Sequence, residues 1–91
     1  MKEENVKFIK NYELTLNYSN AVTINSNYMD FQFVFSQQIV EENVVVKELC
    51  KVVMSPQHAK VFRDLLDNQI KKYEKYNGEI YTPEIKEQNG V

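Results

Sequence analysis

The chain has few of the residues that cross-link a protein or bind metals and phosphate. Its 91 residues include one cysteine, one histidine, two glycines, two prolines and no tryptophan. A single cysteine, Cys50, excludes an intrachain disulfide framework. With His58 as the one histidine, the chain cannot supply a tetrahedral nitrogen–sulfur metal site. Gly78 and Gly90 are isolated and form no glycine-rich phosphate loop, so we expect no metal and no cofactor.

Long apolar runs and a basic surplus are also missing. No run approaches the roughly 18 apolar residues of a membrane span, and the polar first residues predict no signal peptide. We therefore expect a reduced, cytoplasmic protein without membrane contact. The formal net charge is −2, whereas nucleic-acid binders usually carry excess positive charge. Nucleic acid is thus a less favoured partner than another protein chain.

The first half of the chain contains a β-strand pattern. From residue 12 to residue 25 apolar and polar side chains alternate, which predicts strand structure with one apolar face. Asn20 interrupts the pattern, so residues 19–20 are either a turn or bulge between two strands or a bend in one long strand. Residues 1–11 are interpreted as an N-terminal arm. The apolar members of the alternation are Tyr12, Leu14, Leu16, Tyr18, Val22 and Ile24.

The clearest predicted strand covers residues 30–36. Phe31, Phe33 and Phe35 share one of its faces, and we expect them to form the core under a helix; the alternative is an exposed stacking platform. A turn at residues 25–27 precedes it, and a charged loop at residues 39–43 follows. The next strand is predicted over residues 44–54, where Glu48 falls among apolar side chains. Either a bulge changes the alternation or both faces are partly covered.

A long helix is predicted to follow directly. Ser55 is a suitable N-cap and Pro56 a suitable first helical residue. Gly78 is a natural C-terminal stop, so the helix has about 21 residues. One apolar stripe runs along it at spacings of three and four. Its members are Ala59, Phe62, Leu66, Ile70 and Tyr73, widened by Val61 and Leu65.

Two stretches of the chain carry a family resemblance. Residues 55–60 read S-P-Q-H-A-K and residues 72–80 fit K-Y-E-x-x-x-G-x-I. The chain thereby resembles a family of small bacterial proteins catalogued as a domain of unknown function, over roughly residues 18–80. The resemblance implies the strand-then-helix layout and no activity. Ser19 stands where the family pattern has alanine, and the tail beyond Ile80 has no counterpart.

Catalytic chemistry finds little support in the remaining side chains. His58 and Cys50 would form a nucleophilic pair only within hydrogen-bond reach, and a structural role is favoured for both. Asp64 and Asp67 fit a solvated helix face. We therefore predict no catalytic residue and no enzyme.

These patterns together predict an α+β domain: a three- or four-stranded antiparallel meander followed by one C-terminal amphipathic helix packed on the sheet. The domain spans residues 12–80, and residues 81–91 form a mobile tail. One helix covers one sheet face, so the apolar residues of the other face predict a homodimer or higher homo-oligomer. Counting along the predicted strand 44–54 puts Lys47 and Lys51 on the same face as Val45, Leu49 and Val53. The candidate interaction surface consists of Val34, Val45, Lys47, Leu49, Lys51, Val53 and His58.

Three functions fit this reading of the sequence. The first is a non-enzymatic binding or assembly module that acts as a homo-oligomer, with room for a further protein partner. The second is a single-stranded nucleic-acid binder that uses the sheet aromatics together with Lys47 and Lys51. The third is a small chaperone-like subunit that offers an apolar sheet face to unfolded chains.

Overall fold

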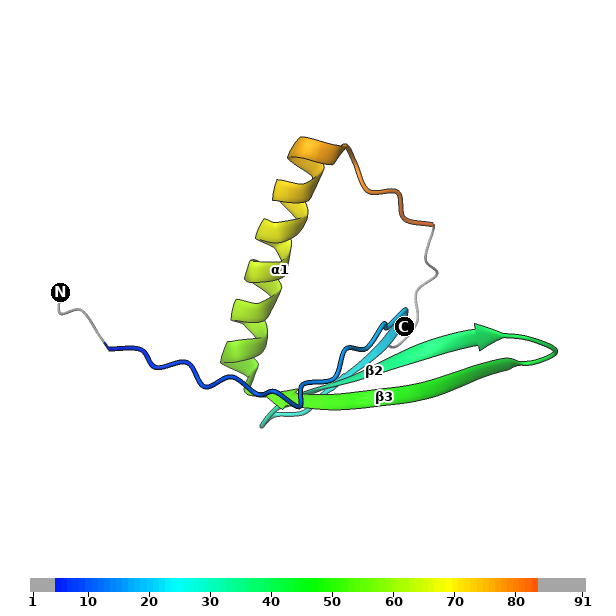
Figure 1. Ribbon diagram of the computed structural model, residues 1–91, viewed down its shortest axis with the longest axis horizontal. Helices are drawn as coiled ribbons and strands as arrows, with labels where there is room; N and C mark the ends of the chain where they lie inside the picture. The colour runs from blue at the N-terminus through cyan, green and yellow to red at the C-terminus, as the bar shows by residue number, and fades with distance from the viewer. Residues whose placement is uncertain (1–4, 84–91) are drawn as a thin grey trace.

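A three-stranded antiparallel sheet followed by one helix makes up the fold (Figure 1). The computed structural model describes residues 5–83. Strand order in the sheet follows the chain, so the predicted meander is confirmed with three strands. The elements are β1 (Ala21–Ser26), β2 (Phe31–Val40), β3 (Val44–Met54) and α1 (Pro56–Asn77).

Short turns join the strands. The first was predicted at residues 25–27, but β1 continues to Ser26 and the turn is residues 27–30. Between β1 and β2 the side chain of Asn27 accepts hydrogen bonds from the backbone N–H groups of Met29 and Asp30, at 2.7 and 3.0 Å. Such an Asx turn reverses the chain without strain. Between β2 and β3 the turn is residues 41–43 alone, because Ile39 and Val40 still belong to β2. The predicted loop is therefore two residues too long.

A bulge in β3 explains the imperfect alternation of that strand. Phe35 lies opposite Cys50 and Ser36 lies opposite Glu48, so Leu49 has no partner in β2. One extra residue in β3 breaks the strict alternation, so side chains beyond the bulge lie on the opposite face from the one that alternation predicts. Glu48 consequently shares the face of Ser36, away from the three phenylalanines. Of the two explanations offered by the sequence, the structure shows the bulge.

The sheet begins later than the alternation predicts. Residues 12–18 belong to no strand, and Tyr12 and Leu16 are almost fully exposed. The cause lies in the Asn20 side chain, whose Oδ1 accepts from the Gln38 N–H at 2.7 Å while Nδ2 donates to the Gln38 carbonyl at 3.3 Å. A longer β1 would need the same Gln38 backbone N–H and carbonyl for its own hydrogen bonds to β2. Asn20 therefore closes the ladder, and the prediction of strand structure before residue 19 is wrong.

Helix α1 has the predicted ends. The Ser55 hydroxyl accepts from the His58 N–H at 3.1 Å, which satisfies one of the free N–H groups of the first turn. At the other end Gly78 has φ of 90° and donates its N–H to the Glu74 carbonyl at 3.0 Å. Residues 81–83 are exposed and outside any helix or strand, and the rest of the predicted tail lies outside the described residues.

The helix packs on the sheet through its first turns only. Among the described residues Phe33 and Ala59 are the buried apolar side chains, at 6% and 8% exposure. Beyond these turns α1 projects away from the meander (Figure 1). The prediction of a helix laid along the sheet thus holds for its start. Because α1 has 22 residues, about 33 Å, a chain that leaves the sheet at an angle soon loses contact with it.

Candidate interaction surface

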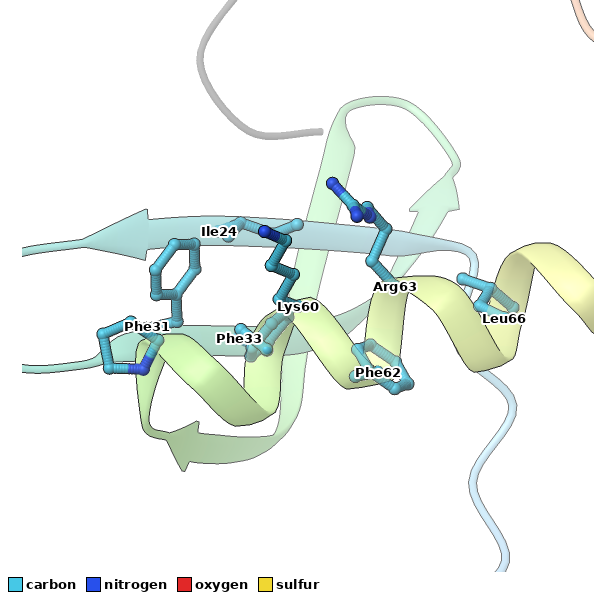
Figure 2. Close-up of a pocket in the computed structure, with 9 residues that line it drawn as sticks. Ile24, Phe31, Phe33, Lys60, Phe62, Arg63 and Leu66 are labelled. Carbon is cyan, nitrogen blue, oxygen red and sulfur yellow. The ribbon is translucent and has the colours of Figure 1, made fainter.

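An apolar groove lies between the start of α1 and the phenylalanine face of the sheet. Figure 2 labels Phe33 of β2 and Phe62 of α1 among the residues that line it. Their rings meet edge to face, with centroids 5.7 Å apart, and Phe33 stacks on Phe35 at 6.4 Å. The groove has a volume of about 460 Å³. Its apolar lining residues are Ile24, Phe31, Phe33, Pro56, Ala59, Phe62 and Leu66.

Two basic side chains complete the groove on its helix side. Lys60 and Arg63 both line it (Figure 2). Arg63 is engaged with the neighbouring Asp64, whose Oδ1 accepts from the guanidinium at 3.0 Å. Ligand pockets usually combine an apolar lining with several convergent polar groups. This groove offers the apolar lining and two cations of one helix, so it fits apolar side chains better than a polar small molecule.

The groove opens onto an apolar stripe that continues along α1 without cover. Leu66 is 50% exposed, Ile70 38% and Tyr73 53%. These residues follow Phe62 at helical spacing on the same side of α1. Val61 and Leu65 flank the stripe and are also exposed. The groove and this stripe therefore form one continuous apolar surface, which we call the α1 surface.

The candidate interaction surface predicted from the sequence is only partly brought together. Val34 and Lys51 are cross-strand partners, and Val53 lies opposite Gln32 in the same pair of strands. Since cross-strand partners point to the same face, Val34, Lys51 and Val53 lie together on the face away from Phe33. This part of the predicted surface exists as one patch.

The other predicted members lie elsewhere. Val45 pairs with Ile39 beside the β2–β3 turn, and Lys47 pairs with Gln37, which puts both on the phenylalanine side of the sheet. Leu49 is the unpaired residue of the bulge. The expectation that Lys47 and Lys51 share a face is wrong, because the bulge lies between them and reverses the alternation.

The remaining member, His58, belongs to the first turn of α1 and is exposed. Cys50 is also exposed and lies within β3 opposite Phe35. Four residues of extended strand, about 13 Å, separate Cys50 from the end of β3, after which the helix that carries His58 begins. Within residues 5–83 no group of three His, Cys, Asp or Glu side chains is close enough to hold a metal ion.

Sequence reasoning missed two features of this region. It treated Asn20 as an interruption, although its side chain completes the sheet by pairing with Gln38. It also did not foresee the groove. The signal was present, since Ser55 starts the helix immediately after Met54, and Met54 pairs with Phe31. A helix that begins there has its first turns beside the phenylalanines.

The described part of α1 is neither long enough in apolar residues nor free enough of charge to cross a membrane, and α1 is the one helix in residues 5–83. Comparison with curated proteins and with solved structures found no match. A family model described as "Protein of unknown function (DUF3467)" matches residues 2–82. The match takes in the strands, the helix and the segment before β1, and it extends further toward the N-terminus than the resemblance read from the sequence. The chain therefore belongs to the DUF3467 family.

Proposed function

We propose that the protein is a non-enzymatic binding module that works as a homo-oligomer. The observation that carries this proposal is the apolar side-chain surface that residues 5–83 leave exposed. On the α1 surface Leu66 is 50% exposed and Tyr73 53%, and on the far sheet face Val53 is 51% exposed. Among the described residues Phe33 and Ala59 are the buried apolar side chains, so most of the apolar surface has no cover within these residues.

Exposed apolar surface of this kind usually marks an interface. Small domains with few buried side chains commonly gain their stability from association. Self-association would give the exposed helix the apolar cover that its own sheet does not provide.

The arrangement of the reactive side chains supports a role without catalysis. Cys50 is exposed on a strand and His58 is exposed in the first helical turn. The groove is lined by apolar residues and two cations, which suits recognition of apolar side chains. Turnover that disappears in His58→Ala or Cys50→Ala would overturn this part of the proposal.

Size-exclusion chromatography with light scattering tests the proposal directly. We expect a mass of two or more chains, and an unfolding temperature that rises with protein concentration because association stabilises only the folded chain. A single-chain mass at all concentrations would contradict the proposal. Absorbance at 260 nm, recorded in the same run, tests the nucleic-acid alternative: co-purified nucleic acid released by salt would favour it. Its stacking platform has lost support, since Phe33 is buried.

The chaperone-like alternative makes a different prediction. A surface that holds unfolded chains should suppress the aggregation of a model substrate at low ratios of substrate to protein. A homo-oligomer that covers the α1 surface should not. Suppression of aggregation by a single-chain form would therefore replace the assembly proposal with the chaperone one.

A further inference from the structure

We propose that the groove between α1 and the phenylalanine face receives a turn of a second copy, formed by residues 11–14. This inference rests on the proposed function and names a contact that would hold the homo-oligomer together. It joins two features of the described chain. One is an exposed turn that carries an aromatic and an acidic side chain, and the other is a groove lined by aromatic and basic ones.

The turn is already formed in the single chain and presents its side chains to solvent. The Asn11 carbonyl accepts from the Leu14 N–H at 3.2 Å, and Asn11 Oδ1 accepts from the Glu13 N–H at 2.9 Å. These bonds place Tyr12 and Glu13 at the two central positions of a four-residue turn. Tyr12 is 91% exposed, and Glu13 is exposed beside it. A preformed turn loses little conformational entropy when it docks.

The aromatic part of the match is the Tyr12 ring. The groove holds about 460 Å³, and three of its apolar lining residues are phenylalanines (Figure 2). Aromatic rings pack favourably against one another, and tyrosine is a common interface anchor because its ring fills an apolar pocket. The ring of the chain's own Tyr12 does not fill the groove, since it is almost fully exposed.

The charged part of the match is the Glu13 carboxylate. Lys60 and Arg63 line the groove, and no acidic residue is among the lining residues within the described part of the chain. Arg63 is already paired with Asp64. Lys60 is therefore the lining cation that makes no ion pair within residues 5–83. We expect the Glu13 carboxylate of the second copy to pair with Lys60.

A second copy is a natural source of the turn. Every copy of the chain carries both the turn and the groove, and the family model matches residues 2–82, which include both. Two copies can therefore exchange turns, so that the turn of each enters the groove of the other. Such an exchange is reciprocal and closes around a two-fold axis, which limits the assembly to a pair.

Charge reversal tests the proposed ion pair. Glu13→Lys and Lys60→Glu each bring like charges together, so we expect each variant to raise the dissociation constant of the pair roughly tenfold or more. Light scattering should then give one chain at concentrations where the parent gives two. Both side chains are exposed, so neither change should unfold the chain, which circular dichroism checks. Glu41→Lys makes the same charge change in the β2–β3 turn and should keep the parent mass.

Mixing the two variants gives a readout that a merely destabilising substitution would not produce. In a mixed pair the Glu13→Lys turn meets the Lys60→Glu groove, and the parent turn meets the parent groove, so both contacts are restored. We expect an equimolar mixture to regain the mass of two chains. If either variant alone keeps the parent mass, or if the mixture stays at one chain, the inference is overturned while the oligomer stands. A parent chain of single-chain mass at all concentrations overturns the proposed function as well.

Discussion

The meander and the helix of this small domain meet their structural needs in different ways. Residues of β1, β2 and β3 satisfy one another's backbone groups, and the Asn20 side chain completes the ladder at its open end. Helix α1 satisfies its own backbone and has good caps at both ends, yet most of its apolar stripe is exposed. The sheet thus depends on partner strands for its hydrogen bonds and the helix does not. Both leave apolar side chains exposed: Val53 of the sheet is 51% exposed and Leu66 of the helix is 50% exposed.

This difference shows that local signals and packing are separate requirements. Ser55, Pro56 and Gly78 define where α1 begins and ends without reference to the rest of the protein. An isolated helix of this length is only marginally stable in water, and packing of its apolar face usually supplies the remainder. A well-capped helix with an exposed stripe is therefore an element whose packing the proposed association would complete.

We expect the largest loss of stability from Phe33→Ala, because Phe33 joins the sheet to the helix. It is 6% exposed and contacts both Phe35 and Phe62. Removing a buried phenylalanine ring costs about 3–5 kcal/mol, which would unfold a domain with so small a core. Urea denaturation followed by circular dichroism measures the change. The matched control is Phe8→Ala, whose ring is 86% exposed, and an equal loss in both variants would contradict the role of Phe33.

Asn20→Ala tests whether the sheet depends on its closing side chain. The variant loses both hydrogen bonds to the Gln38 backbone, and at 0.5–1.5 kcal/mol each we expect a loss of about 2 kcal/mol. Hydrogen exchange should speed up at the Gln38 amide and leave the β2–β3 ladder near Phe33 protected. Asn17→Ala is the control, since Asn17 bonds only to the neighbouring Thr15 side chain among the described contacts. Unchanged exchange at Gln38 would show that the ladder ends for another reason.

Ser55→Ala tests the independence of the helix start. Loss of the N-cap hydroxyl should lower the free energy of unfolding by about 1 kcal/mol, because the His58 N–H loses its acceptor. Ser55→Asn keeps a capping oxygen and should retain most of the stability. Thermal unfolding of the three proteins at equal concentration gives the comparison. If alanine and asparagine behave alike, the cap is not what defines the start of α1.

We expect the smallest loss of stability from a substitution on the exposed side of α1. Lys71 and Asp67 form an i,i+4 ion pair with a nitrogen–oxygen distance of 3.0 Å. Lys71→Gln should cost only about 0.3–0.5 kcal/mol, and high salt should remove the difference between variant and parent. A loss above 1 kcal/mol that persists in salt would mean that this side of α1 is buried in an assembly.

Sequence patterns predicted most of the individual elements. The three phenylalanines of β2, the span of β3 and both ends of α1 were recognised because alternation, caps and a glycine stop act through neighbouring residues. The bulge at Leu49 was one of two explanations for a single irregularity, the position of Glu48. Only the pairing of β3 with β2 could decide between them, since register involves residues from two strands.

The candidate interaction surface was harder to predict from sequence patterns. Its members on β3 were assigned to one sheet face by counting along that strand, and the bulge divides them. Residues 12–18 have a strand pattern but no strand partner, because a side chain at Asn20 occupies the backbone groups they would need. The sequence by itself determined the order, type and most boundaries of the elements, through interactions a few residues apart. Only the tertiary structure decided which faces meet and which stripe stays uncovered, because those depend on contacts between segments distant in the chain.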